Sequence, residues 1–537
     1  MNKLLPLLLL VLAVLPVRAQ LNASLLSNFD FGVNVNDVWG YVSPDGTEYA
    51  LVGLDTGVAI VNLADPTQPE LVGVTRGVRS TWRDMKTYGE YAYAVTDQPR
   101  TEEGLTVIDL RSLPESFAVQ YITDTVPGTL RPFYRAHNLY IDTLRGLAFT
   151  SGGDGNVNAG GMLIWDLKED PWHPKVVAKG PATYSHDVYV QDDIMYASEI
   201  YIGELALYDV SDIDNITQIG RTKTPFEFTH NAWANASGDY VFTTDELADA
   251  SVAAFDISDP ASIELVDEYR PLGSLNTKTF PHNVHVIDDY LSISYYTDGL
   301  RVVDASVPDN LVEIANYDTW LGENGGYNGD WGAYPFLPSG NTLVSDRATG
   351  LYVVSVDYRR AARLMGTITD SVSGSPINLA SIEILTEQPN ATSTDALGAY
   401  ATGIAEGAEY RVAIAADGYR PDTLTATLTN GEITTLDVAL VDTAFVTTSV
   451  AFPRADDVRT ALYPNPAHGA SRLDYTLRGI PAAKLEIYSA AGALIESRIL
   501  ASATGSIRVG EQLAPGMYLL HLTENGRPLR TIKYVRF

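Results

Sequence analysis

A segment of about 50 residues recurs seven times in the first two thirds of this chain, and this repeat constrains the fold more than any other feature. Each copy contains an apolar stretch rich in β-branched residues, and most of these stretches end in Asp and a turn. The seven stretches are GVAIVNLADP (57–66), GLTVIDLRSL (104–113), GMLIWDLKED (161–170), ELALYDVSDI (204–213), SVAAFDISDP (251–260), GLRVVDASVP (299–308) and GLYVVSVDYR (350–359). This pattern predicts a strand followed by a turn in every copy.

Each copy has room for further strands on both sides of this stretch. A second apolar stretch precedes it, as in EYALVGLD (48–55), a third lies before that, and a fourth follows most copies, as in ELVGVTR (70–76). Four short antiparallel strands repeated at this period are typical of a β-propeller, whose blades bury their faces against one another. We therefore predict an all-β chain with a seven-bladed β-propeller over residues 20–361, whose last outer strand comes from residues 25–35.

The net charge of the chain restricts the classes of partner that it can bind. It carries 36 basic and 67 acidic residues, a net charge of −31. Nucleic acids and anionic membranes are bound through clustered Lys and Arg, so we exclude nucleic acid as a partner. Cations or a salty habitat fit the acidic surface better, and the alternative that the charge only maintains solubility remains open.

The N-terminus has the pattern of a secretory signal peptide over residues 1–19, with Lys3 before an apolar core and cleavage after Ala19. That core is short for a membrane span and no later stretch is longer, so we expect no transmembrane segment in the mature chain. The chain has no cysteine, which excludes disulfides and a cysteine-linked lipid anchor.

The repeats resemble a known family through LRVVDAS (300–306), VAAFDIS (252–258) and the strands that contain His-Asn or His-Asp. They are similar to the LVIVD-repeat, choice-of-anchor B family of secreted bacterial proteins, over the whole predicted ring. The resemblance implies a secreted propeller with an exchangeable C-terminal anchor. It implies no particular chemistry.

Residues 362–442 have a different sequence pattern, in which segments of alternating apolar and polar residues, typical of strands, are separated by glycine-containing turns. They resemble the carboxypeptidase regulatory-like domain, which implies a small Ig-like β-sandwich without peptidase chemistry. The matching positions are Gly366, Asp370, Gly374, Pro376, Thr394, Asp395, Gly398, Ala399, Tyr400, Gly407, Gly418 and Tyr419.

A linker over 443–460 leads to a last domain over 461–537, which we also expect to be a small β-sandwich. Its motifs strongly resemble the type A C-terminal sorting domain of the type IX (Por) secretion system. The residues that carry this resemblance are Tyr463, Pro464, Asn465, Pro466, Pro515, Gly516, Tyr518 and Lys533. The resemblance implies a Bacteroidetes-type bacterium, translocation across the outer membrane by the type IX machinery, removal of the domain and attachment to surface lipopolysaccharide. The alternative is another adhesive Ig-like sandwich.

Four of the eight histidines occupy the same point of the repeat, in AHNLYI (136–141), SHDVYV (185–190), THNAWA (229–234) and PHNVHV (281–286). Because the innermost strands of a propeller start or end at the mouth of its channel, His137, His186, His230 and His282 are candidate ligands of one divalent metal. Acidic residues near the ends of the adjacent strands supply candidate partners: Glu199 for His186, and Asp245 or Glu246 for His230.

A structural role is the alternative for the same segment, and strand geometry favours it. A polar residue follows the histidine position in all seven copies, which makes these residues candidate ligand or channel-mouth positions: Asp37, Asp84, Asn138, Asp187, Asn231, Asn283 and Asp330. Asx side chains accept backbone N–H bonds in tight turns. Side chains of a radial strand also alternate toward the neighbouring blades, where histidines can bond from blade to blade. Both interpretations stay open.

The chain lacks the common catalytic motifs, namely GxSxG, a Walker loop and GxGxxG after a strand. We therefore assign no catalytic residue. We interpret the chain as a secreted, surface-displayed binding or scaffold protein with an unknown protein or carbohydrate ligand. The alternative is an extracellular metal-dependent enzyme, a hydrolase or oxidase, with the histidine site at the channel mouth. The cofactor is unknown, and a divalent metal is the candidate.

Overall fold

The structure is a computed structural model that describes residues 20–98, 103–386, 390–443, 458–480, 483–524 and 527–537. The described residues form 43 strands and two short 3-10 helices, η1 (Asn158–Gly160) and η2 (Leu272–Ser274), which confirms the all-β prediction. The predicted signal peptide lies outside these residues, as does most of the predicted linker. Within them, no helix has the length and apolar character needed to span a membrane.

The chain divides into two compact units. Residues 271–273, 304–314 and 359–537 form the second unit, and the residues before 359 that remain form the first. Residues 304–314 contain the last residue of β24 and the first three residues of β25, so part of the sixth four-stranded sheet belongs to the second unit.

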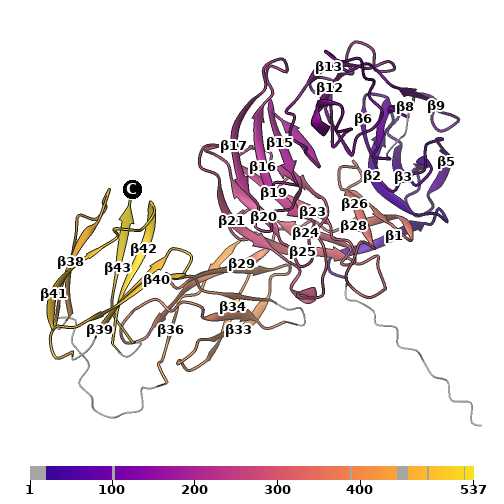
Figure 1. Cartoon of the computed structure of the whole chain (residues 1–537). Helices are drawn as coiled ribbons and strands as arrows, with labels where there is room; N and C mark the ends of the chain where they lie inside the picture. The colour runs from indigo at the N-terminus through magenta and orange to yellow at the C-terminus, as the bar shows by residue number, and fades with distance from the viewer. Residues whose placement is uncertain (1–19, 99–102, 387–389, 444–457, 481–482, 525–526) are drawn as a thin grey trace, which may run out of the picture. The chain divides into compact units, whose positions relative to one another are not determined.

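Seven four-stranded antiparallel sheets follow one another along residues 23–356 (Figure 1). In the order of their innermost strands they are β2–β5 (Val35–Val42, Glu48–Leu54, Gly57–Asn62, Glu70–Val74), β6–β9 (Arg83–Tyr88, Tyr91–Thr96, Leu105–Asp109, Ala118–Ile122), β10–β13 (Asn138–Asp142, Leu147–Ser151, Leu163–Asp166, Lys175–Lys179), β14–β17 (Val188–Gln191, Ile194–Glu199, Glu204–Asp209, Thr217–Lys223), β18–β21 (Thr229–Ala234, Tyr240–Asp245, Val252–Asp256, Glu264–Tyr269), β22–β25 (Val284–Ile287, Tyr290–Ser294, Leu300–Asp304, Val312–Tyr317) and β26–β28 with β1 (Asp330–Tyr334, Asn341–Asp346, Gly350–Val356, Ala23–Phe29).

The sheets close into a ring. Their first strands contact one another in the cyclic order β2, β6, β10, β14, β18, β22, β26 and back to β2. The last sheet takes its outer strand from the other end of the chain, since β1 pairs antiparallel with β28 and sets Ala23 opposite Val356. The segment predicted for this role was 25–35, whereas the strand covers Ala23–Phe29. The arrangement is that of a β-propeller.

The core of the propeller lies between adjacent sheets rather than at its centre. Between the second and third sheets, Val107 of β8 packs in one cluster with Leu139 of β10 and Trp165 of β12. The Trp165 side chain is fully buried, and its ring meets that of Phe133 edge to face at 4.9 Å. Since alternate residues of a strand point to opposite faces, apolar residues at successive positions let each sheet bury both faces.

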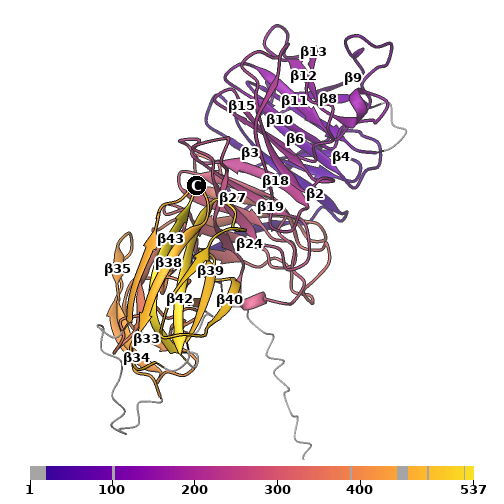
Figure 2. The same ribbon diagram turned by 60° about the vertical axis from the view of Figure 1, so that its left-hand side comes forward.

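The second unit contains two β-sandwiches in sequence, in agreement with the predicted fold class (Figure 2). The first has sheets β32-β29-β35, with β36 also on β29, and β31-β30-β33-β34; its strands are Ala362–Asp370, Ser381–Ile384, Ala391–Ser393, Ala399–Ile404, Glu409–Ala415, Asp422–Thr427, Ile433–Thr435 and Val438–Leu440, numbered β29 to β36. The second has sheets β37-β38-β41 and β40-β39-β42-β43, with strands Val458–Tyr463, Ser471–Leu477, Ala483–Ser489, Leu494–Leu500, Thr504–Val509, Gly516–Glu524 and Arg527–Arg536, numbered β37 to β43.

Candidate functional site at the channel mouth

The innermost strands of the propeller begin around one polar cavity. Its empty space, including the opening to solvent, is about 540 Å³, of which about 40 Å³ is open to the centres of water molecules. Such a space holds about three waters. All seven sheets contribute to the lining, which consists of Asp37, Trp82, Arg83, Asp84, Lys86, His137, Asn138, Tyr140, His186, Asp187, Val188, His230, Asn231, Trp233, His282, Asn283, His285 and Trp331.

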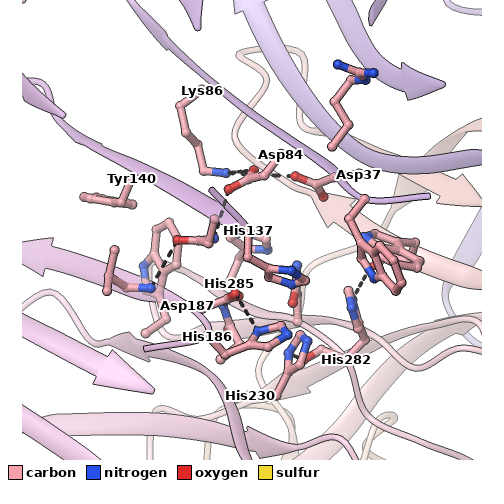
Figure 3. Close-up of a pocket in the computed structure, with 18 residues that line it drawn as sticks. Asp37, Asp84, Lys86, His137, Tyr140, His186, Asp187, His230, His282 and His285 are labelled. Atoms are coloured by element: carbon pink, nitrogen blue, oxygen red, sulfur yellow. Dashed lines mark hydrogen bonds and ion pairs between the residues drawn. The ribbon is translucent and has the colours of Figure 1, made fainter. Parts of the chain in front are cut away.

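The four repeat histidines come together along one side of this cavity (Figure 3). Successive ring centroids are 4.0 Å apart from His137 to His186, 4.1 Å from His186 to His230 and 4.4 Å from His230 to His282. The next ring in the series is that of Trp331, 4.8 Å from His282. The structure therefore brings together the four imidazoles that the sequence placed at one point of the repeat.

Backbone carbonyls fix the tautomer of two of these histidines. Nδ1 of His230 lies 3.0 Å from the carbonyl oxygen of His282, and Nδ1 of His282 lies 2.5 Å from that of Trp331. A carbonyl oxygen only accepts hydrogen bonds, so both Nδ1 atoms donate. In the neutral imidazole this leaves a lone pair on Nε2, the state in which histidine binds metals.

Carboxylates orient the other two imidazoles. Nδ1 of His137 lies 3.0 Å from Asp97 Oδ2, and Nδ1 of His186 lies 2.9 Å from Asp187 Oδ1. Burial lowers the pKa of His137, but the hydrogen bond and charge of Asp97 outweigh it and raise the pKa overall. For His186, burial and the neighbouring His137 prevail, and the pKa is lowered.

The two histidines with carbonyl partners have the strongest preference for the neutral form. Burial holds the pKa of both His230 and His282 well below the ordinary value. Their side chains are therefore uncharged at neutral pH, because the cost of burying the charged form outweighs the interactions that favour it. Glu246 Oε2, 3.8 Å from His230 Nε2, is beyond hydrogen-bond distance.

The Asx residues after the histidine position form a belt of hydrogen bonds from sheet to sheet. Asp84 Oδ2 accepts from the backbone N–H of Leu139 at 2.6 Å and from the amide of Asn138 at 2.9 Å. The Asn138 Oδ1 atom accepts from the N–H of Val188 at 3.2 Å in the next sheet, whereas Asn283 Oδ1 has no hydrogen-bond partner among the described residues, so the belt does not continue past the sixth sheet. Asn231 donates to Asp187 at 3.0 Å and accepts from Val284 at 3.0 Å. These Asx side chains therefore form hydrogen bonds to the next sheet, and not to backbone N–H groups of a turn within their own sheet.

The belt departs from prediction in the last sheet. Asp330 is fully buried away from the cavity lining, opposite Asp346, and the structural equivalent of the other Asx residues is Gly332. A bulge at Trp331 shifts the register, just as a bulge at His230 does in the fifth sheet. A Cβ on Gly332 would lie 2.5 Å from Asp37 Oδ1, so this position has no room for an Asx side chain.

Two predicted acidic partners do not face the histidines. Glu199 is buried with its carboxylate bonded to the Tyr208 hydroxyl at 2.6 Å and to Arg221 at 2.9 Å. Asp245 accepts from the Thr224 hydroxyl and from two backbone N–H groups, because strand β19 directs it away from the channel. The next residue, Glu246, lies just after the end of β19, and its Oε2 is 3.8 Å from His230 Nε2. Of the two candidate partners of His230, Glu246 is therefore the one that lies near it.

A cationic group lies on another part of the cavity wall (Figure 3). Lys86 Nζ is 2.5 Å from Asp84 Oδ1 and 3.9 Å from Asp37 Oδ2, and it lies over the ring of Trp39 at 4.4 Å. Burial lowers the pKa of Lys86, but the two carboxylates outweigh it and raise the pKa, so the side chain stays charged. Sequence reasoning missed Lys86, although it shares a strand face with Asp84 two residues earlier.

The C-terminal sandwich brings together motifs that lie far apart in the sequence. Asn465, in the turn after β37, donates to the carbonyl of Lys533 at 2.6 Å and accepts from the N–H of Val535 at 3.0 Å. Pro464 accepts from the Ser471 hydroxyl at 2.5 Å, and Pro466 continues the same turn. At the start of β42, Gly516 follows Pro515, and the Tyr518 hydroxyl bonds to the carbonyl of Ala514 at 2.8 Å. These motifs hold the terminal strand in place.

Comparison with protein families matches the two C-terminal domains and two segments of the propeller. Residues 461–535 match the secretion system C-terminal sorting domain. The chain carries a type IX sorting domain. Residues 363–441 match the carboxypeptidase regulatory-like domain, and residues 234–270 and 282–319 match the LVIVD repeat. The sorting domain indicates export by the type IX machinery to the cell surface.

Comparison with whole proteins adds only distant likenesses. No curated protein matches the chain. Among solved structures, a candidate 6-phosphogluconolactonase from Bacteroides uniformis is 14% identical, with a TM-score of 0.39 over 51% of this chain and 82% of that one. The Cps50 (Swd1) β-propeller domain of Myceliophteria thermophila is 11% identical, with a TM-score of 0.41 over 61% of this chain and 98% of its own.

Proposed function

We propose that this protein is a cell-surface binding protein whose propeller recognises a ligand at the channel mouth. The observation that carries the proposal is the cavity to which all seven sheets contribute. Its wall combines imidazoles, carboxylates, amides and one ammonium group with three tryptophan rings, a mixture typical of ligand sites.

The size of the cavity limits what enters it. Space for about three waters admits a single polar group, such as a sugar hydroxyl or a short side chain. The proposed ligand is therefore a carbohydrate or protein that inserts one such group. Trp82, which is 42% exposed, offers an apolar surface at the same cavity for the remainder of the ligand.

Tryptophan fluorescence of the mature protein tests this recognition. Titration with a panel of monosaccharides, oligosaccharides and short peptides is expected to give a saturable change, because three tryptophans line the cavity. Lys86→Met is expected to weaken that response, and His173→Ala, on an exposed side chain outside the lining, is the matched control. A response unaffected by Lys86→Met, or no response across the panel, contradicts the proposal.

Surface display is tested separately. A chain that lacks residues 461–537 is expected to remain inside the cell envelope, whereas the full chain becomes accessible to protease added to intact cells. We further propose that the exported protein is attached to lipopolysaccharide once the sorting domain is removed. This attachment predicts a heterogeneous increase in mass that disappears in cells without the polysaccharide, and an unchanged mass in both strains refutes it.

The second candidate function is an extracellular metal-dependent hydrolase or oxidase. The four adjacent imidazoles with fixed Nδ1 partners favour it, since a neutral ring held through Nδ1 offers Nε2 as a metal ligand. Turnover of chromogenic esters or phenols that requires added metal, and is lost in His186→Ala, would support this candidate over simple binding. Activity that chelator leaves unchanged counts against it.

A further inference from the structure

Glu246 forms a group with His230 and His282. The sequence alone did not distinguish this group from the other histidines and acidic residues around the cavity. Glu246 Oε1 accepts from the Tyr296 hydroxyl at 2.7 Å, and its Oε2 lies 3.8 Å from His230 Nε2. One ligand atom from each of His230, Glu246 and His282 lies within 4.8 Å of the others. The two histidines are only 2% and 3% exposed, so this group is built into the propeller wall.

The hydrogen bonds of this group leave electron pairs, not protons, on the atoms that approach one another. Both Nδ1 atoms donate to backbone carbonyls, which leaves Nε2 of each neutral ring as an acceptor. Burial raises the pKa of Glu246 to about 7, and in the ionised form, which a bound cation favours, Oε2 is a third acceptor. The 3.8 Å between Oε2 and His230 Nε2 is beyond hydrogen-bond distance. Buried acceptors directed at one another are stabilised by a positive centre between them.

We propose that His230, His282 and Glu246 bind one divalent first-row transition-metal ion through the two Nε2 atoms and Oε2. Two imidazoles and a carboxylate are ligands that suit zinc and its neighbours in that row. The carbonyls of His282 and Trp331 and the hydroxyl of Tyr296 hold the three ligands from behind, as outer partners do in metal sites. The inference rests on the proposed channel-mouth site and is independent of surface display.

The neighbouring histidine pair has a different role. Asp187, which lies near His137 and His186, already accepts from His186 Nδ1 at 2.9 Å and from Asn231 at 3.0 Å. Both carboxylate oxygens of Asp187 thus accept hydrogen bonds that orient neighbouring side chains. In Glu246 only Oε1 accepts such a bond, and Oε2 is available to an ion. The His186 ring lies 4.1 Å from that of His230, beside the proposed ligands.

Binding requires a small contraction of the group. Ligand atoms held at about 2.0 to 2.2 Å from one tetrahedral ion lie about 3.3 to 3.6 Å apart, against separations of up to 4.8 Å here. The contraction requires side-chain movement, and Glu246, which lies just after the end of β19, can contribute to it by rotation about its side-chain torsions. Three protein ligands leave one position of a tetrahedral ion open, which is the arrangement of catalytic rather than structural zinc sites.

Metal titration of the mature full-length protein tests the inference. Chelator-treated protein is titrated with Co²⁺ while visible absorption is recorded, and with Zn²⁺ in competition. We expect one ion per chain. Glu246→Gln keeps an acceptor for Tyr296 but removes the anionic ligand, so it is expected to weaken Co²⁺ binding by at least about 10-fold. His282→Ala is expected to abolish binding, with circular dichroism confirming that the variant is folded.

His173→Ala is the matched control, because His173 is exposed beside Asp170 and outside the cavity; it is expected to bind like wild type. Wild-type protein that binds no stoichiometric ion, or Glu246→Gln that binds as tightly as wild type, overturns the inference. The fluorescence titration with sugars and peptides is repeated on the metal-free protein. If the protein binds no metal but still responds to a sugar or peptide, the metal site alone is refuted. If it neither binds metal nor responds to any sugar or peptide, the proposed function is refuted as well.

Discussion

Replacing Asp330 by Asn is expected to stabilise the propeller, and by an amount that depends on pH. Asp330 and Asp346 are both fully buried, and the Thr319 hydroxyl approaches an oxygen of each. One hydroxyl proton serves only one of the two carboxylates. Oδ1 of Asp346 also accepts from two backbone N–H groups, at 2.9 and 3.0 Å, whereas Asp330 Oδ2 has no partner among the described residues.

Burial and the neighbouring Asp346 hold the pKa of Asp330 well above its ordinary value. A raised pKa in the folded state means that the protonated group favours folding below about pH 4, the unfolded value, and that this contribution is lost as pH rises through the folded pKa. Asparagine removes the titration and supplies N–H donors toward Asp346. The gain should match the cost of one unsatisfied buried polar group, about 1–3 kcal/mol at pH 8, and be near zero at pH 4.

Urea unfolding of the mature protein, followed by circular dichroism from pH 4 to pH 8, measures this difference. The free energy of unfolding of Asp330→Asn should exceed that of wild type increasingly as pH rises. Glu70→Gln, at an exposed position of β5, should leave the curve unchanged. A gain of equal size at pH 4 and pH 8, or destabilisation at every pH, refutes the reasoning from the buried carboxyl pair.

Three further substitutions have defined outcomes. Gly332→Ala places a methyl group 2.5 Å from Asp37 Oδ1 and is expected to destabilise the propeller by about 1–3 kcal/mol in urea unfolding, with no effect if the Asp37 side chain can move aside freely. Arg83→Met leaves Glu103 without its buried ion-pair partner at 2.8 Å and is expected to cost about 3–5 kcal/mol, of which the added change Glu103→Leu should recover a large part; equal instability of the double variant contradicts this. Asn465→Ala removes both bonds to the terminal strand, so the protease-accessible fraction on intact cells should fall relative to the exposed control Arg459→Ala, and equal display of the two variants argues against a role for this turn in sorting.

The sequence was sufficient to predict the repeat architecture because each sheet encodes its own strands. The period of the apolar stretches predicts the four-stranded sheets. A histidine at the same point of four copies left two outcomes open, a shared site or bonding between sheets, and the rings do lie side by side while His230 and His282 also bond to carbonyls of the next sheet. Ring closure through β1 was also predictable, since the last copy lacks an outer strand of its own. The strand pattern therefore contains most of the fold and the location of the candidate site.

The ligand set was not predictable in the same way because it depends on single-residue register. Asp245 and Glu246 are adjacent, yet the strand directs the first to Thr224 and only the second reaches His230. The bulge at Trp331 moves Asp330 out of the belt and puts Gly332 in its place. A bulge has no distinct sequence signature, so an alignment by residue type assigns the wrong side chain to the cavity.

The pairing of β1 with β28 also determines when the propeller can fold. Phe29 and Leu351, which face each other in this pair, are 322 positions apart in the chain. Contacts of such long sequence separation form late and raise the entropic cost of closure. The ring therefore stays open until the residues of β28 have been synthesised, and only then does the propeller become a closed body.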